Sequence, residues 1–389
     1  MQKGTILFLI NASILTIALS LGLYGNFVPI FAEKLGASYL DLGIIGTVFS
    51  LPYIILPALV GLLSDRVDRR PLYLGGVIGC AITPFLFIYA SNVIDIILIR
   101  AFNGVAYAFM WPCIEALVAD LTNAEERTKA MGKYSFSWAA GFLLGPFIGA
   151  LMMTVTNDNY PFLYLNGFFI ALLATSVAFY GLHGYRRIDH QESFGEDSRP
   201  FRPSALLSVL LPVLGYSLSL GLQTSIFPAY ASNLGLSVST IGILFAIFGV
   251  VRVSTFLFAH RIAKIGNRRS FALALMTQIF ALLLIAFMRN FLALLLFNIL
   301  FGFAMGILSP LTLTLASKAA PNGKVGLAIG LTEATFGLGM TLGPFIGGIA
   351  AQLVSPEMPY IVIAVITFAI LALTLSANST GGTNQSRIR

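Results

Sequence analysis

Gly141-Phe-Leu-Leu-Gly-Pro-Phe-Ile-Gly149 recurs later in the chain as Gly339-Met-Thr-Leu-Gly-Pro-Phe-Ile-Gly347. A second segment, Leu35-Gly-Ala-Ser38, recurs as Leu234-Gly-Leu-Ser237. The members of each pair are 198 or 199 residues apart. The 389-residue chain therefore consists of two similar halves in the same order. Two parallel repeats around a site at the bilayer midplane are a recurrent plan of membrane carriers.

The composition predicts a protein embedded in a membrane. Hydrophobic residues make up 57% of the chain and charged residues only 10%, against roughly 25% charged residues in soluble domains. About 20 apolar residues cross the bilayer core, and the backbone there must satisfy its own hydrogen bonds as a helix. We predict twelve membrane-spanning helices at residues 5–31, 40–63, 71–90, 94–118, 132–155, 161–182, 204–231, 238–259, 270–288, 290–317, 324–352 and 358–377.

These spans define the fold class and the domains. We expect an all-α integral membrane protein with two pseudo-symmetric six-helix bundles, at residues 1–182 and 204–377. A polar linker at 183–203 and a polar tail at 378–389 are expected to be cytoplasmic. The first apolar stretch is longer than the roughly 7–15 residues of a signal-peptide core, so we expect it to be retained as a span.

Positive charges predict the orientation. If both termini are cytoplasmic, every Lys and Arg outside the spans lies on that side except Lys34 and Arg289. This bias is typical of a multi-pass cell-membrane protein with both ends inside. The net charge of +7 is thus explained without nucleic-acid binding.

Three motifs resemble the major facilitator superfamily. Gly61-Leu-Leu-Ser-Asp-Arg-Val-Asp-Arg-Arg70 is similar to its loop signature, although Asp68 replaces the usual Gly. Arg100-Ala-Phe-Asn-Gly104 resembles the Arg-x-x-Gln-Gly signature of proton-coupled members, with Asn103 in place of Gln. The 141–149 segment resembles the Gly-x-x-x-Gly-Pro-x-x-Gly signature of drug–proton antiporters. The resemblance covers nearly the whole chain and implies a twelve-helix carrier. The first span departs from many multidrug members because it has no acidic residue within the bilayer.

The loop motif and the Gly-Pro segments are candidate gating elements. Asp65 follows a helix end where the helix dipole disfavours an anion, so it needs a positive partner. The neighbouring arginines or the amino terminus of the eleventh span would serve, and the resemblance implies a latch between the halves; the alternative is solvated charges that only set topology. Glycines four residues apart permit close helix packing, and Pro bends the helix. The gating candidates are Gly61, Asp65, Arg66, Arg69, Arg70, Gly141, Gly145, Pro146, Gly149, Gly343, Pro344 and Gly347.

Charged residues inside the spans are candidates for proton coupling, because such charges are costly unless they face a partner or a wet cavity. Arg100 and Glu115 lie about 22 Å apart along one helix and cannot pair directly. Arg100 could pair with Asp41, bind an anionic group or tune a proton site, and Glu115 could carry a proton or pair with loop arginines. Arg252 and Glu333 lie at similar depth and could form an ion pair. Either Glu115 or Glu333 could be the proton carrier.

Polar and aromatic residues in the spans that resemble cavity-lining helices are candidates for substrate contact. Asn103, Tyr107 and Trp111 share one helix face with Arg100. The alternative to substrate contact is that the aromatic residues only pack against other helices or face lipid. The cavity candidates are Asn11, Tyr24, Asn103, Tyr107, Trp111, Tyr216, Gln223 and Asn298.

The sequence favours a monomeric secondary transporter that exports small hydrophobic or amphipathic compounds in exchange for protons. A carrier for a sugar, an organic anion or a lipid-like metabolite is the near alternative. A lipid-modifying membrane enzyme would need a catalytic cluster, and a sensor would need an appended soluble domain. The sequence contains no nucleotide-binding loop, and no cofactor or metal is expected.

Overall fold

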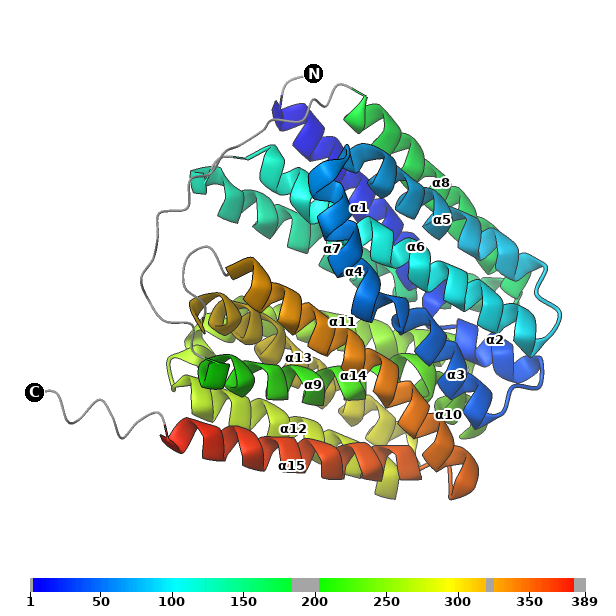
Figure 1. Ribbon diagram of the computed structural model, residues 1–389. Helices are drawn as coiled ribbons and strands as arrows, with labels where there is room; N and C mark the ends of the chain where they lie inside the picture. Colours follow the sequence, from blue (N-terminus) through cyan, green and yellow to red (C-terminus); the bar gives the residue numbers. More distant parts are fainter. Residues whose placement is uncertain (1–2, 123, 184–202, 320–324, 381–389) are drawn as a thin grey trace, which may run out of the picture.

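The computed structural model describes residues 3–122, 124–183, 203–319 and 325–380. Within those residues, twelve helices are long and apolar enough to span a membrane, as predicted. The predicted linker at 183–203 and tail at 378–389 lie mainly outside the described residues. The elements form two halves that lie side by side, with both chain ends toward one end of the molecule (Figure 1). We call this end the terminal face and the opposite end the distal face.

The N-terminal half contains eight helical elements. The first two predicted spans are each divided in two, because a proline occupies the first turn of α2 and of α4. Proline lacks the N–H that would continue the preceding helix, but its fixed φ suits a first turn. The elements are α1 (Lys3–Gly25), α2 (Val28–Lys34), α3 (Tyr39–Ser50), α4 (Pro52–Arg66), α5 (Arg69–Ile88), α6 (Val93–Asp120), α7 (Ala124–Val155) and α8 (Tyr160–Leu182).

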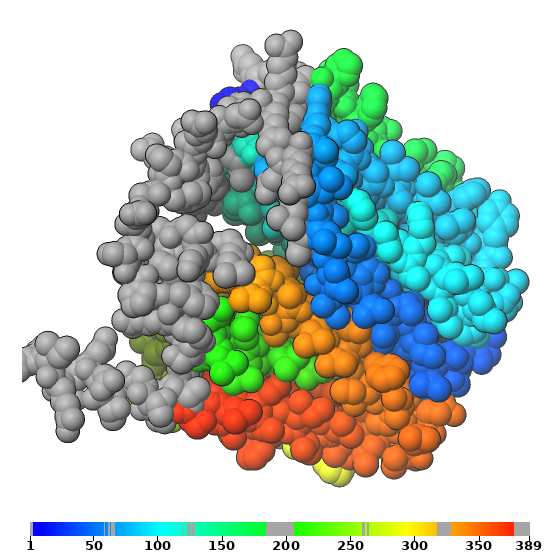
Figure 2. Space-filling model, viewed as in Figure 1, coloured from blue at the N-terminus to red at the C-terminus, as the bar shows by residue number. Residues whose placement is uncertain are grey.

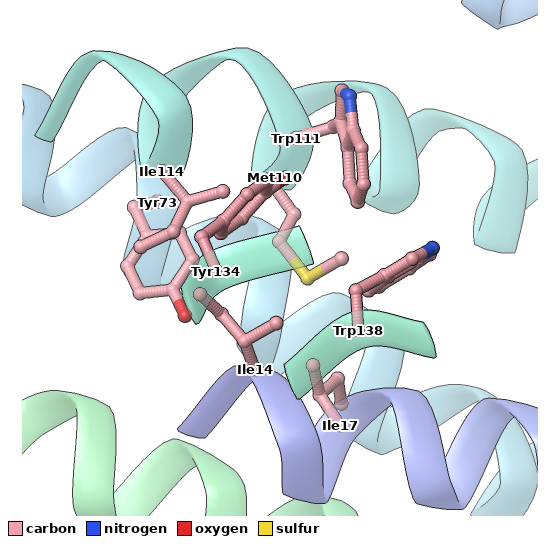
Figure 3. A pocket seen from close by; sticks show the side chains of 8 residues that line it. All are labelled: Ile14, Ile17, Tyr73, Met110, Trp111, Ile114, Tyr134 and Trp138. Atoms are coloured by element: carbon pink, nitrogen blue, oxygen red, sulfur yellow. The ribbon is translucent and has the colours of Figure 1, made fainter. Parts of the chain in front are cut away.

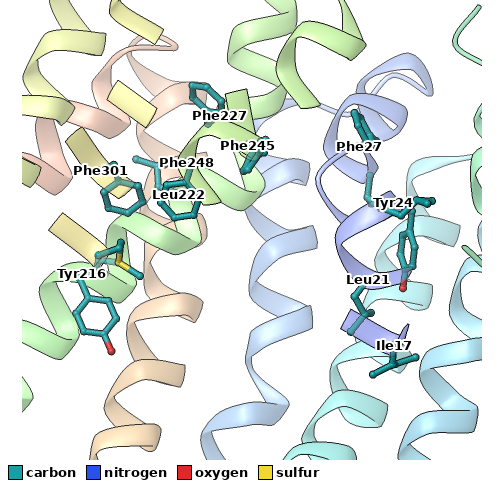
Figure 4. Packing of buried hydrophobic residues seen from close by; sticks show 14 of the residues in the cluster. Ile17, Leu21, Tyr24, Phe27, Tyr216, Leu222, Phe227, Phe245, Phe248 and Phe301 are labelled. Carbon is teal, nitrogen blue, oxygen red and sulfur yellow. The ribbon is translucent and has the colours of Figure 1, made fainter. Parts of the chain in front are cut away.

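The C-terminal half repeats this order. Its first span is also divided, and Pro228 in the first turn of α10 corresponds to Pro29 in α2. The elements are α9 (Pro203–Ser225), α10 (Phe227–Asn233), α11 (Val238–Ala263), α12 (Asn267–Phe287), α13 (Phe291–Ala319), α14 (Val325–Leu353) and α15 (Met358–Thr380). The buried apolar residues form one cluster to which both halves contribute (Figure 4).

The repeated Leu-Gly-x-Ser segments form the same turn twice. Gly36 and Gly235 have φ values of +91° and +87°, a region that side chains rarely adopt. The serines that follow cap the next helices: Ser38 accepts a hydrogen bond from the Asp41 N–H, and Ser237 accepts one from the Thr240 N–H. Turn geometry and helix capping therefore explain why these letters recur.

The halves meet through α3 and α4 against α14 and through α7 against α11. The space-filling view shows the blue surface of α3 and α4 against the orange surface of α14 (Figure 2). At the distal face, Asn233 Nδ2 donates to Tyr39 Oη (2.9 Å), and a Thr154–Ser239 hydrogen bond of 2.7 Å joins α7 to α11. Toward the terminal face the two halves diverge (Figure 1). Large exposed apolar side chains such as Phe169 and Leu98 suit contact with lipid.

Pro344 creates a hydrogen bond between the halves. Because proline has no N–H, the Met340 carbonyl four residues earlier has no helical donor. Ser50 Oγ of α3 lies 2.9 Å from this carbonyl oxygen and donates to it. Thr47 Oγ1 similarly lies 3.2 Å from the Thr341 carbonyl oxygen. The repeated proline thus supplies an acceptor at the junction of the halves.

Candidate functional site

An aromatic cluster lies where the two halves meet. Its members are Tyr53 of α4, Tyr107 and Trp111 of α6, and Tyr134 and Trp138 of α7. The ring centroid of Tyr107 lies 5.7 Å from that of Tyr53 and 5.9 Å from that of Trp138. The Trp111 and Trp138 rings meet edge to face at 4.5 Å. Tyr107, Trp111 and Trp138 are only half-buried, so part of each ring is available to a ligand.

Two glutamates from opposite halves contact this aromatic cluster. Tyr134 Oη lies 3.5 Å from Glu115 Oε1 within the N-terminal half, and it donates to that carboxylate. Tyr53 Oη lies 3.3 Å from Glu333 Oε2 and donates to it across the junction of the halves. Glu115 and Glu333 are within electrostatic range of each other. The sequence placed these acids in separate hypotheses, and the structure brings them to one site.

A small apolar pocket adjoins the aromatic cluster inside the N-terminal half. Side chains of α1, α5, α6 and α7 line it, with Trp111 and Trp138 on one side and Tyr134 on the other (Figure 3). The other lining residues are Ile14, Ile17, Tyr73, Met110 and Ile114. The partly exposed aromatic side chains beside the two carboxylates, rather than this tightly filled pocket, suit contact with a ligand that has a flat apolar body and a polar or charged group.

Neither hypothesised ion pair forms between the charged residues in the spans. Asp41 instead completes the cap of α3: its Oδ2 accepts hydrogen bonds from Ser38 N (2.8 Å) and Ser38 Oγ (2.7 Å), which keeps it away from Arg100. Glu333 pairs with Tyr53 of the other half rather than with Arg252. Arg252 lies within electrostatic range of Tyr107 and Tyr216, so it still belongs to the periphery of the central site.

The structure describes the side chains of only part of the loop motif at residues 61–70. Arg69 pairs with Asp120, and its Nη1 also donates to the Ala116 carbonyl at the end of α6. Asp68 caps α5 by accepting from the Arg70 N–H at 3.0 Å and also pairs with the Arg70 guanidinium. This cap gives a reason for Asp where the superfamily usually has Gly. The side chains of Gly61, Asp65 and Arg66 lie outside the description, so the latch remains a prediction.

The repeated glycines pack inside each half. A Cβ on Gly145 would lie 2.6 Å from the Leu23 nitrogen of α1, and one on Gly347 would lie 2.5 Å from Leu222 Cδ1 of α9. Gly141 and Gly149 also face α1, and Gly343 faces α9. The carbonyls of Pro146 and Pro344 instead face the other half, near Gly242 and Gly43 respectively. The segment therefore serves both packing within a half and contact between halves.

The cavity candidates do not lie at one site. Tyr107 and Trp111 belong to the aromatic cluster, and Tyr216 contacts Phe336 of α14 with ring centroids 5.9 Å apart. Asn11 donates to the Leu7 carbonyl of its own helix (2.8 Å). The remaining candidates, all fully buried, lie within one half each: Tyr24, Asn103, Gln223 and Asn298.

Sequence reasoning missed Tyr53, Tyr134 and Trp138. Tyr134 and Trp138 are four residues apart, a spacing that places side chains on one helix face. Tyr53 has no comparable local signal, since its role depends on Glu333 of the other half.

Two six-helix halves around a shared central site are the architecture of a secondary membrane transporter. The Major Facilitator Superfamily model matches residues 10–218 and 211–387. The chain belongs to this superfamily, and it is a multi-pass membrane transporter rather than an enzyme.

Curated relatives match over most of the chain. Multidrug resistance protein 1 of Bacillus subtilis (strain 168) is 27% identical over 386 residues, which cover 97% of each chain. Quinolone resistance protein NorA of Staphylococcus aureus (strain MSSA476) is 24% identical and covers 88% of this chain and 89% of its own.

Solved structures share the fold. A bacterial homologue of the human lysosomal transporter Spinster, in an inward-facing and unoccupied conformation, has a TM-score of 0.76 at 14% identity and covers 97% of each chain. The nucleoside transporter NupG has a TM-score of 0.73 at 14% identity and covers 97% of this chain and 98% of its own.

Proposed function

We propose that this chain is a monomeric carrier that exports amphipathic aromatic compounds, cations in particular, in exchange for protons. The observation that supports it most is the convergence of Glu115 and Glu333, from opposite halves, on one aromatic cluster. Carboxylates attract a cation, and aromatic faces add a cation–π attraction of roughly 0.5–2 kcal/mol. The names of the multidrug and quinolone resistance relatives agree with the export of drug-like compounds.

The contact between Tyr53 and Glu333 provides a physical link between proton binding and conformation. It joins the two halves, so a rocking motion that separates α4 from α14 would remove this hydrogen bond from Glu333. The Tyr134–Glu115 contact lies within one half and would survive the same motion. Glu333 is therefore the proposed coupling residue, and Glu115 the proposed attractor for the substrate. Protons and substrate would compete for the two carboxylates, which is the requirement for exchange.

The arrangement of the halves suggests which compartment the site faces. The halves touch at the distal face and diverge at the terminal face. With the termini in the cytoplasm, as the positive charges predict, the site would be open to the cytoplasm and closed to the outside. We propose the domain limits 1–182 and 204–377 for the two rocking bodies.

Transport by the purified full chain in proteoliposomes tests the function. An aromatic monocation such as ethidium is added outside vesicles with an acidic interior, and its uptake is driven by this pH gradient. We expect Glu333→Gln to lose proton-driven flux but keep ethidium exchange, and Glu115→Gln to weaken ethidium affinity by about tenfold, the effect of one charge-assisted hydrogen bond. Glu357→Gln is the matched control, because Glu357 pairs with Arg289 near the distal end and away from the cluster.

Two results would refute the proposal. One is full proton-driven ethidium flux in both the Glu115 and Glu333 variants. The other is a compound panel in which only organic anions or sugars move protons.

A further inference from the structure

A second polar site lies inside the N-terminal half, away from the two glutamates. We call it the Arg100 cluster; its members are Tyr24 of α1, Arg100 and Asn103 of α6, and Tyr164 of α8. Tyr24, Asn103 and Tyr164 are fully buried. The rings of Tyr24 and Tyr164 meet edge to face at 6.1 Å, and both tyrosines lie within electrostatic range of the Arg100 guanidinium.

The Arg100 cluster contains hydrogen-bond donors that no described residue accepts. Arg100 Nη1 donates weakly to Asn103 Oδ1 at 3.4 Å, and the guanidinium lies 4.1 Å above the Phe49 ring. The Arg100 Nε, the Asn103 Nδ2 and the hydroxyls of Tyr24 and Tyr164 are buried without a partner among the described residues. Each such group carries a desolvation penalty unless something accepts its hydrogen.

The positive charge also lacks a carboxylate. Within the described part of the chain, Arg100 forms no salt bridge, and its acidic candidate Asp41 is occupied in the cap of α3. A cation inside a membrane bundle normally has a partner that offsets its desolvation. The face of Phe49 supplies part of this compensation, and the remaining donors point to a negatively charged acceptor.

The C-terminal half contains a natural comparison. Gln223 and Asn298 occupy the positions that correspond to Tyr24 and Arg100, at the 199- and 198-residue offsets of the repeats. Gln223 Nε2 donates to Asn298 Oδ1 at 3.0 Å, and Asn298 Nδ2 donates to the Leu294 carbonyl at 2.9 Å. These neutral amides bond to each other and need no counter-ion. The need for an anion is thus confined to the N-terminal copy.

We propose that the Arg100 cluster binds a small monovalent anion, with chloride as the species to test. Arg Nε and amide Nδ2 can only donate, and the two phenols can donate as well, so these residues offer unpartnered donors beside a positive charge. A water molecule could accept these hydrogens but would not offset that charge. Because three of the four residues are fully buried, a compact ion fits better than the carboxylate of a larger solute. The ion would join α1, α6 and α8, and this site is independent of the proposed substrate.

Thermal unfolding of the purified full chain in detergent tests the site. Sodium chloride is compared with sodium gluconate at equal ionic strength, and bromide serves as a second small anion. We expect a saturable rise in Tm with chloride and bromide only, because a ligand that binds the folded state stabilises it. Tyr24→Phe and Tyr164→Phe should each weaken the apparent chloride affinity about tenfold, the effect of one hydrogen bond to a charged group.

Matched variants distinguish a bound ion from a general salt effect. Tyr360→Phe removes a hydroxyl that is equally buried and equally unpartnered, but it lies in the C-terminal half. We expect this control to keep the wild-type chloride response. In gluconate, all three Phe variants should be at least as stable as the wild type, because the deleted hydroxyls bond to no described residue. Arg100→Gln should abolish the response; if that variant does not fold, the Tyr→Phe variants still decide the question.

The proposal is overturned if chloride and gluconate give the same Tm. It is also overturned if Tyr24→Phe, Tyr164→Phe and Tyr360→Phe respond to chloride identically, because the ion would then bind elsewhere. Neither result bears on ethidium transport, so failure of this site and failure of the proposed function are separable.

Discussion

The Ser50 hydroxyl should control how firmly the two halves close at the distal face. Its Oγ donates to the Met340 carbonyl that Pro344 leaves without a helical donor, at 2.9 Å, and Ser50 is 4% exposed. In Ser50→Ala, the Met340 carbonyl has no hydrogen-bond donor from the protein or from water as long as the halves are in contact. When the halves separate there, water can reach the carbonyl. The substitution therefore destabilises the distally closed state selectively.

The expected magnitude follows from the burial of the bond. An acceptor left unpaired in a buried position costs about 1–3 kcal/mol, which is a factor of about 5 to 150 in the ratio of closed to open molecules. The difference in helix propensity between Ser and Ala is present in both states and cancels. Ser50 Oγ also lies 2.9 Å from the Gly46 carbonyl oxygen of its own helix. The single hydroxyl proton is shared between these two acceptors, so we expect a value in the lower part of this range.

Distance measurements between spin labels would check this. Labels at Val155→Cys and Val354→Cys report on the distal ends of α7 and α14, where both side chains are exposed and the native Cys80 and Cys113 are buried. We expect Ser50→Ala to increase the population with long distances. Ser176→Ala is the control, since that hydroxyl bonds only to the Leu172 carbonyl of its own helix. An unchanged distribution in Ser50→Ala would show that the proline-freed carbonyl does not hold the halves together.

Two further predictions address the junction and the aromatic cluster. Gly43→Ala should open the distal face in the same spin-label assay at a cost of about 1–3 kcal/mol, because its Cβ would lie 2.6 Å from the Pro344 carbonyl oxygen. A Cβ on Gly330 would meet nothing within 4 Å, so Gly330→Ala should be neutral. Equal behaviour of the two variants would contradict close backbone packing at Gly43. Trp138→Ala should weaken ethidium binding, measured by fluorescence titration, by roughly tenfold, as expected for loss of an aromatic contact. Phe136→Ala, on the same helix and 70% exposed, should leave binding unchanged, and equal losses would remove Trp138 from the site.

The twelve spans were predictable because membrane helices depend on local composition, which a single sequence displays directly. The breaks before Pro29, Pro52 and Pro228 were not predicted, since proline within an apolar run is compatible with either a kink or a new helix. These breaks are visible only when the neighbouring helices are placed.

The central site was predictable in part. Glu115 and Glu333 stood out because acids are rare in the spans. Tyr53 and Trp138 did not, since a chain with 32 Phe and 14 Tyr offers many aromatic residues of equal appearance. The partners of the acids depend on contacts between positions far apart in the chain, such as the 280 residues between Tyr53 and Glu333. An expected partner at similar depth, Arg252, lies on a helix of the same half and does not pair with Glu333.

Among the described residues, a side chain of the other half bonds to the carbonyl that the repeated proline leaves free at only one of the two edges where the halves meet. Pro146 leaves the Phe142 carbonyl of α7 without a helical donor in the same way, but the residue that corresponds to Ser50 is Gly249, which has no hydroxyl to offer. Among the described side chains, the Thr154–Ser239 hydrogen bond alone joins α7 to α11, whereas Thr47 and Ser50 make three hydrogen bonds between α3 and α14. The edge formed by α7 and α11 should therefore separate first, with the α3–α14 edge acting as the hinge. Despite the duplicated sequence, the exit path for a solute would then be asymmetric and would begin between α7 and α11.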